Sequence, residues 1–468
     1  MIVMKFGGTS TQDAEAMRNV ARIVKSRIDQ QPIVVISAVA RATNMLEFAG
    51  KSAAEGKLAE AQTTVSEFVA RHDDIVEMLV TDPYRKSALK AAIVQAGNEL
   101  GDIVKGVAIL RELTPRTLDS IYCYGELLSS RLVAAALEEI NVPSEWVDTK
   151  DFLITDERHT RAMPIMDIVE EKLQNRIVPL VAQGKVVVTQ GFIGMTPSGR
   201  RTTMGRESSD YSATIIGAGI GATDVEIWTD VDGILTADPA VVEIPKKLRI
   251  LPFQEAFELA YFGAKVLHPN TMLPAVDRNI PIQIYNSRRP GQSGTTVTAT
   301  SDENTGLVKS IAYKRNIVQL TISPLKRFGI YIFWEHVFNI LTRYNAVPLM
   351  TSTSEYSMSI ALEGRQNLQP IVHELQEVAD VECTDGRAVL CLVGANLRGA
   401  PLVMRRVFDG LDGDEIYMMS FGATASSIGI LLDDKAVLQA VRRLHKEFFE
   451  ADSNTDLFED LAHYHSRV

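Results

Sequence analysis

The sequence predicts an α/β fold over about the first 300 residues, followed by two smaller α+β units. Three observations support this prediction. The chain opens with an apolar strand, a two-glycine turn and an amphipathic helix. Strands and helices alternate again from Val142 to about Val297. Beyond residue 306, a strand–helix–strand–strand–helix pattern occurs twice, which indicates an internal duplication.

The opening βαβ unit has a lysine and two glycines where its first strand ends. The motif KFGGTS, residues 5–10, follows an apolar run, and Ser10 or Thr11 is the expected helix cap. After Pro32 the run Ile33–Ile36 suits a buried parallel strand. Glycine turns and helix starts present backbone N–H groups to anions, so this junction is typical of a polyphosphate site.

The next region is predicted to be helical. Residues 51 to about 141 lack strand alternation, and Ala61, Val65, Phe68 and Val69 follow the spacing of one helical face. The polar stretch 301–306 ends in glycine and marks the expected domain boundary. We therefore expect a first domain over 1–300 and two smaller modules over 307–385 and 386–468.

Composition limits the possible functions. The hydrophobic content of 46% supports real cores, and the net charge of −11 disfavours nucleic acid as a partner. Three scattered cysteines fit a reducing, cytoplasmic setting, and no apolar run is long enough to span a membrane. The eight histidines form no cluster with ligand spacing, so no protein metal site is expected.

Four further motifs accompany KFGGTS. They are YGELLS at 124–129, GRESSDYSA at 205–213, WTDVDGILTADP at 228–239 and FGAKVLHP at 262–269. As a combination they resemble the aspartate kinases of the amino-acid-kinase superfamily. The resemblance implies an amino-acid-kinase fold, with a mostly parallel sheet between helices, followed by two ferredoxin-like ACT modules. In related kinases these modules are interleaved, with the last part of the chain completing the first.

The implied reaction is transfer of a phosphoryl group from ATP to the β-carboxylate of L-aspartate. The product, 4-phospho-L-aspartate, begins the route to lysine, threonine, methionine and isoleucine. A carboxylate nucleophile needs no base, so catalysis would rest on positioning and on charge stabilisation. Mg²⁺ would be held mainly by the ATP phosphates. ACT modules further imply allosteric feedback by an amino acid and a homo-oligomer.

The resemblance also implies roles for individual residues. Lys5 would stabilise the transition state, and Asp210 would orient the side chain of Lys5. Glu126, expected to begin a helix, would meet the substrate ammonium group, while Arg206, Ser209 and Thr43 would contact the substrate. The nucleotide-binding residues would be Lys5, Phe6, Gly7, Gly8, Thr229, Asp230, Leu235, Lys265 and Val266, with Gly7 and Gly8 donating backbone N–H groups to phosphate.

Some positions depart from the family pattern. Glu207 and Ser208 stand where two glycines are common, and Ala240 stands where an arginine often follows the Asp-Pro pair, although nearby Lys246 and Lys247 could compensate. These departures leave two alternatives open. One is a kinase for a related carboxylate, and the other is a catalytically inactive amino-acid sensor.

The effector is also left open. The loop Thr353, Ser354 and Glu355 looks like the effector loop of the first ACT module. Leu349 falls where lysine-inhibited relatives have an aspartate that binds the effector's amine, so lysine, threonine, another effector and lost regulation all remain open.

Overall fold

The computed structural model describes residues 1–205, 208–263, 267–299, 307–325, 330–365, 367–450 and 457–461. The chain divides into two compact units. Unit 1 comprises Met1–Gly233 and Asn270–Ala299, and unit 2 comprises Ile234–Pro269 and Thr300–Val468. The expected boundary at 301–306 lies outside the described residues, so the predicted domain limits stay a prediction.

Unit 1 is built on a mostly parallel sheet. Its strands run in the order β3-β4-β2-β1-β7-β10-β11, and only the last pair is antiparallel. The strands of this sheet are β1 (Ile2–Phe6), β2 (Pro32–Ile36), β3 (Ser144–Trp146), β4 (Val186–Gln190), β7 (Asp224–Thr229), β10 (Ile282–Asn286) and β11 (Thr295–Thr298). All five residues of β2 are buried, as expected for a parallel strand covered on both faces.

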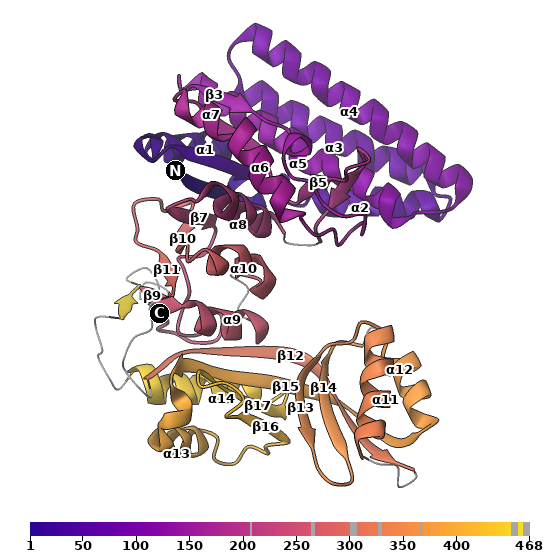
Figure 1. The fold of residues 1–468 in the computed structure, drawn as a ribbon, viewed down its shortest axis with the longest axis vertical. Coiled ribbons are helices and arrows are strands. Elements are labelled where there is room, and N and C mark those ends of the chain that lie inside the picture. The colour runs from indigo at the N-terminus through magenta and orange to yellow at the C-terminus, as the bar shows by residue number, and fades with distance from the viewer. Residues whose placement is uncertain are drawn as a thin grey trace. The chain divides into compact units, whose positions relative to one another are not determined.

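Helices cover this sheet, and α3, α4 and α5 lie beside one another (Figure 1). The helices of unit 1 are α1 (Ala14–Lys25), α2 (Ala42–Ala54), α3 (Leu58–Leu79), α4 (Pro83–Leu110), α5 (Pro115–Glu139), α6 (Met166–Arg176), α7 (Val178–Ala182), α8 (Ser209–Ile220) and α10 (Pro269–Asp277). The predicted helical region is confirmed, since Ala61, Val65 and Phe68 are buried on one face of α3.

The cap predicted for α1 was wrong. Residues Gly8–Thr11 form a short 3₁₀ turn, and the helix begins only at Ala14. Asp13 is the N-cap, and its carboxylate accepts a hydrogen bond of 2.9 Å from the backbone N–H of Ala16. The glycine turn therefore continues into a 3₁₀ turn before the helix starts.

Unit 2 contains a second sheet, antiparallel throughout, with the order β13-β14-β12-β15-β17-β16. Its strands are β12 (Leu307–Pro324), β13 (Pro348–Thr353), β14 (Met358–Glu363), β15 (Ala379–Ala395), β16 (Met418–Phe421) and β17 (Ser427–Asp433). The remaining elements of the unit are β8 (Lys246–Leu248), β9 (Ile250–Pro252), α9 (Phe253–Tyr261), α11 (Ile330–Arg343), α12 (Leu368–Gln376), α13 (Pro401–Gly410), α14 (Val437–His445) and β18 (Phe458–Asp460).

Two long strands run through both halves of this second sheet. The first part of β12, from Leu307 to Lys314, pairs with the second part of β15, from Val389 to Ala395. The second part of β12 pairs with the first part of β15 and with β14. Helices α11 and α12 lie at one end of these strands, and α13 and α14 lie at the other (Figure 1).

The described part of the chain contains no helix that combines the length and the apolarity needed to cross a lipid bilayer.

Candidate active site

An ion pair joins the end of β1 to the start of α8. The Nζ atom of Lys5 lies 2.6 Å from Oδ1 of Asp210, and both side chains are largely buried. Because β1 is a central parallel strand, Lys5 lies at the carboxyl edge of the sheet, where open α/β sheets bind ligands. The predicted pairing of an aspartate with the lysine is therefore present in the structure.

The glycine turn after β1 differs in part from the prediction. The N–H of Gly7 donates to the carbonyl oxygen of Trp228 at 3.1 Å, so it is engaged in the sheet and does not point to a phosphate. Gly8 begins the 3₁₀ turn, and a Cβ atom there would lie 2.9 Å from the carbonyl oxygen of Ala38. This close approach explains why glycine is needed at position 8 and leaves its N–H as the candidate phosphate donor.

Helix α8 presents its N-terminus at the same edge of the sheet. Ser208 is the N-cap and Ser209 is the first helical residue, and both are buried. Ser208 has φ −83°, which any residue adopts, so serine is tolerated at a position where glycine is common in the family. Arg206 and Glu207 lie outside the described residues.

Glu126 is a buried carboxylate within this region. It lies in the middle of α5, so the prediction that it begins a helix was wrong. Its Oε1 accepts a hydrogen bond of 3.1 Å from the N–H of Ala38, and its Oε2 has no partner among the described residues. Burial raises the pKa of Glu126 to about 8, although that hydrogen bond acts in the opposite direction.

Such a carboxylate gains most from a cationic ligand, because an ammonium group would compensate the charge that burial disfavours. Ser37 precedes Ala38, the residue that donates to Glu126. The carbonyl oxygen of Ser37 accepts a hydrogen bond of 2.8 Å from the hydroxyl of Ser129, which also lies on α5. Thr43 lies in the first turn of α2 and is half-buried. Helices α2 and α5 pack against each other, so both elements border this part of the unit.

The loop after β7 is held by residues that the sequence reasoning missed. The backbone N–H of Ser287 donates to the carbonyl oxygen of Thr229 at 2.8 Å, and its hydroxyl donates to the same oxygen at 3.0 Å. The side-chain amide of Asn286 reaches the carbonyl oxygen of Asp230 at 3.4 Å. Thr229 and Asp230 are therefore positioned by the end of β10.

Asp232 reinforces this arrangement. Its Oδ1 accepts a 2.7 Å hydrogen bond from Asn286, and Arg289 forms an ion pair with its Oδ2 at 3.0 Å. The sequence offered one usable signal, because Asn286 and Ser287 are polar residues directly at the end of a predicted strand. A strand end in a parallel sheet is where such residues meet a ligand-binding loop.

For the other predicted nucleotide residues, the nucleotide-binding role stays a prediction. Leu235 belongs to unit 2, where its carbonyl oxygen accepts a hydrogen bond of 2.8 Å from Ser310. Lys265 and Val266 lie outside the described residues. The compensating role considered for Lys247 was wrong, because its side chain is buried and pairs with Glu459 at 3.1 Å.

A buried aspartate anchors the segment that leads towards residue 205. Asp119 is fully buried and accepts hydrogen bonds from the Thr203 hydroxyl at 2.5 Å and from the Thr160 N–H at 3.0 Å. His159 contacts the same carboxylate through Nδ1 at 2.8 Å. Burial raises the pKa of Asp119, and these hydrogen bonds act against that effect. The strand β6 (Arg201–Thr203) is thus tied to α5.

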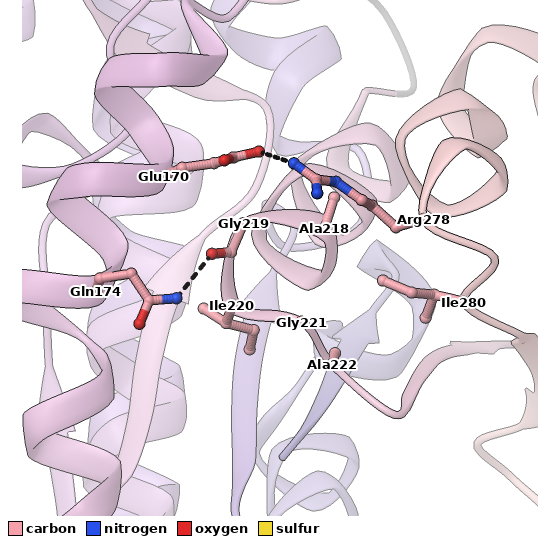
Figure 2. Close-up of a pocket in the computed structure, with 9 residues that line it drawn as sticks. All are labelled: Glu170, Gln174, Ala218, Gly219, Ile220, Gly221, Ala222, Arg278 and Ile280. Atoms are coloured by element: carbon pink, nitrogen blue, oxygen red, sulfur yellow. Dashed lines mark hydrogen bonds and ion pairs between the residues drawn. The ribbon is translucent and has the colours of Figure 1, made fainter.

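No group of three or more His, Cys, Asp or Glu side chains suited to a metal ion occurs among the residues that the structure describes. A cavity of about 430 Å³ lies at the other end of α8 (Figure 2). There Glu170 pairs with Arg278 at 2.7 Å, and Gln174 donates to the carbonyl oxygen of Gly219 at 3.1 Å. This cavity is lined by none of the predicted site residues, and it lies at the opposite end of α8 from Asp210.

The predicted effector loop is an exposed turn between β13 and β14. Thr353 ends β13, and the N–H of Ser354 donates to the carbonyl oxygen of Ser357 at 2.8 Å. The hydroxyl of Ser354 accepts hydrogen bonds from the N–H groups of Tyr356 and Ser357. The structure therefore presents Ser354 and Glu355 at a tight hairpin whose effector role stays a prediction.

Comparison with known proteins agrees with this geometry. The model of the amino acid kinase family matches residues 1–286, and the model of an ACT domain matches residues 390–448. Aspartokinase 1, chloroplastic, of Arabidopsis thaliana is 33% identical over 478 residues, which cover 97% of this chain and 81% of that protein. Lysine-sensitive aspartokinase 3 of Escherichia coli (strain K12) is 33% identical, covering 96% and 99% respectively.

A solved structure gives the same result. The crystal structure of E. coli aspartokinase III in complex with aspartate and ADP aligns with a TM-score of 0.85 and 34% identity, covering 96% of this chain and all of that one. The chain therefore belongs to the amino acid kinase family, and within that family to the aspartokinases. The resemblance and the fold class predicted from the motifs are confirmed.

Proposed function

We propose that the chain transfers the γ-phosphoryl group of ATP to the β-carboxylate of L-aspartate, releasing ADP and 4-phospho-L-aspartate. The observation that carries this proposal is the Lys5–Asp210 ion pair at the carboxyl edge of the sheet. A carboxylate oxygen attacks the γ-phosphorus, the bond to the β-phosphate oxygen breaks, and ADP leaves with that electron pair. No proton has to be moved, so the protein's task is to position two anions and offset their charge.

In this proposal Lys5 stabilises the charge on the transferring group, and Asp210 holds the ammonium group of Lys5 in place. Gly8 donates its N–H to phosphate. Phe6, Gly7, Thr229, Asp230, Leu235, Lys265 and Val266 form or support the nucleotide site. Mg²⁺ is held through the ATP phosphates, where it neutralises their charge.

The substrate aspartate is bound at both of its α groups. Glu126 receives the ammonium group, which supplies the missing partner of its buried Oε2. Arg206 and Ser209 receive the α-carboxylate at the N-terminus of α8, where the helix dipole also favours an anion. Thr43 completes the pocket. One solved relative, E. coli aspartokinase III in complex with aspartate and ADP, supports this chemistry.

We further propose that unit 2 carries two ACT modules and regulates the enzyme by binding an amino acid. One relative is named lysine-sensitive, and one solved relative contains lysine. The strand pairing supports a first module over about 317–384, inserted between the two parts of the second, because the first part of β12 pairs with β15 beside β17. The effector, a homo-oligomeric assembly and a cytoplasmic location are parts of the same proposal.

The test is direct. Purified protein with ATP, Mg²⁺ and L-aspartate should give an acyl phosphate that hydroxylamine traps as a hydroxamate. Glutamate and acetate serve as competing carboxylates, and preferential turnover of either would replace aspartate as the substrate. A protein that binds lysine or threonine but forms no hydroxamate at saturating ATP and aspartate would instead be a sensor.

A further inference from the structure

Arg71 connects two loops that lie beside the candidate active site. It lies on α3 and is half-buried. Its Nη1 donates to the carbonyl oxygen of Ala40 at 2.5 Å, and its Nη2 donates to the carbonyl oxygen of Gln12 at 3.3 Å. Ala40 belongs to the loop between β2 and α2, and Gln12 belongs to the connection between the glycine turn and α1. One side chain on a helix therefore holds both loops.

The two loops also contact each other directly at Gly8. The N–H of Ala40 donates to the carbonyl oxygen of Gly8 at 3.1 Å, and the buried hydroxyl of Thr11 donates to the same oxygen at 3.3 Å. The approach leaves no room for a side chain, because a Cβ atom at Gly8 would lie 2.9 Å from the carbonyl oxygen of Ala38. A shift of either loop would therefore move the other.

Each loop carries a group that the proposed reaction uses. In the loop after β2, the N–H of Ala38 donates to Oε1 of Glu126 at 3.1 Å, and Glu126 is the proposed partner of the substrate ammonium group. In the glycine turn, the N–H of Gly8 is the candidate phosphate donor. The loop after β2 thus belongs to the aspartate side of the proposed reaction, and the glycine turn belongs to the ATP side. Because Arg71 bonds to both loops, it fixes the spacing between the two sides.

The guanidinium group of Arg71 is held by backbone carbonyls and not by an acid. In the described part of the chain its hydrogen bonds go to those two carbonyl oxygens, and no carboxylate bonds to it. Burial lowers the pKa of Arg71, and the nearby charge of Arg41 acts in the same direction, whereas the charge of Asp13 opposes them. Replacing Arg71 therefore removes a bridge between loops without leaving a bonded carboxylate unpaired, which favours a role in positioning.

We propose that Arg71 is a positioning residue that sets the spacing between the γ-phosphoryl group and the attacking carboxylate. Its planar guanidinium group donates to two carbonyl oxygens at once, which holds the two loops at a fixed separation. Two reactants held in line react fastest, and a misplacement of about 1 Å costs on the order of 100-fold in rate. This inference rests on the proposed function. It assigns Arg71 to the chemical step and not to the affinity for either reactant.

The test compares Arg71→Met with Arg18→Met in steady-state kinetics. Arg18 is a matched control because it also donates to a backbone carbonyl oxygen, that of Met78 near the end of α3, and not to either loop. Arg71→Met should lower kcat at least about tenfold and keep the KM for ATP and for aspartate within about threefold of wild type. All three constants of Arg18→Met should stay within about threefold of wild type. Arg71→Lys should remain at least about fivefold below wild type in kcat, because an ammonium group lacks the planar fork that reaches both carbonyls.

A kcat within about twofold of wild type in Arg71→Met would overturn the proposal. An equal loss of kcat in Arg18→Met, full activity in Arg71→Lys, or an effect of Arg71→Met mainly on either KM would also overturn it. If Arg71→Met does not fold, Arg71→Lys carries the test, since it keeps the charge and most of the stem.

A second measurement examines the loops without turnover. Amide hydrogen exchange of the peptide that contains Ala40 should accelerate in both Arg71 variants and not in Arg18→Met, because the N–H of Ala40 bonds to Gly8 across the two loops. Unchanged exchange in the Arg71 variants would overturn the linkage itself. If wild type forms no acyl phosphate but the exchange result holds, the proposed reaction has failed and the linkage has not.

Discussion

Replacing Glu126 with glutamine should raise the stability of the protein and lower its affinity for aspartate. Glutamine has the shape of a protonated glutamate and can still accept the hydrogen bond from Ala38. In the wild type, burial raises the pKa of Glu126 from its ordinary value of 4.5 to about 8. The folded state therefore holds this proton more tightly than the unfolded state does.

The sign of the effect on stability follows from this difference. Below pH 4.5 the carboxyl group is neutral in both states, so its burial causes no loss of unfolding free energy through ionisation. Between pH 4.5 and 8 the unfolded state ionises first, so the wild type loses about 1.4 kcal/mol of unfolding free energy per pH unit, about 5 kcal/mol in full. The Glu126→Gln protein lacks this loss. Denaturant unfolding at pH 5, 7 and 9 should show the variant gaining stability relative to wild type as pH rises.

Aspartate binding should respond in the opposite way. Only ionised Glu126 can pair with an ammonium group, so the KM of the wild type for aspartate should fall about tenfold from pH 6 to 7 and level off above pH 8. Glu126→Gln should raise the KM roughly 100-fold and remove this pH dependence. Glu99→Gln, which changes a carboxylate bonded to Tyr124, is the control and should keep the wild-type profile. A Glu126→Gln enzyme that keeps the pH slope would place the titrating group elsewhere and refute the reasoning.

Three further substitutions test other parts of the structure. Lys5→Met should lower kcat at least about 1,000-fold, because the charge on the transferring phosphoryl group loses its stabilising partner. It should also lower the melting temperature, because Asp210 is largely buried and loses its 2.6 Å ion pair. Turnover near wild type would exclude Lys5 from catalysis. Gly191→Ala should abolish soluble expression or raise the KM for aspartate, as judged by yield and kinetics, since its Cβ would contact Ser209 at 2.6 Å. Lys309→Met removes a buried ammonium group that pairs with the buried Glu255 at 3.1 Å, and it should destabilise the protein by about 3–5 kcal/mol in urea unfolding, whereas the double change with Glu255→Leu should recover most of that loss.

The sequence predicted those features that depend on local patterns. The opening βαβ unit, the helices over 51–141 and the repeated pattern after residue 306 are all present, because periodicity reports which face of an element is buried. The pairing of Lys5 with Asp210 was also predicted, but it rested on resemblance to a family and not on spacing along the chain.

Other features lie beyond such patterns. Nothing in the composition around Phe192 signals a left-handed backbone, because φ at that residue is set by contacts with Ser212 and Met204 that are formed only in the fold. The cap of α1 was misplaced because Ser10, Thr11 and Asp13 are all good caps, and only the 3₁₀ turn decides among them. Glu126 was expected to begin a helix but lies within α5, where Gly125 serves close packing against Ala38.

The strands β12 and β15 have a consequence for how unit 2 can be dissected. Each strand crosses from one half of the sheet into the other. A chain that ended at residue 385 would therefore keep the first part of β12 but lose the second part of β15, with which it pairs. The half that contains β16 and β17 cannot be produced as one continuous piece of sequence, because it needs both the first part of β12 and the second part of β15. The register of β12 against β15 shifts between Lys314 and Gln319, which is where the two halves of the sheet meet.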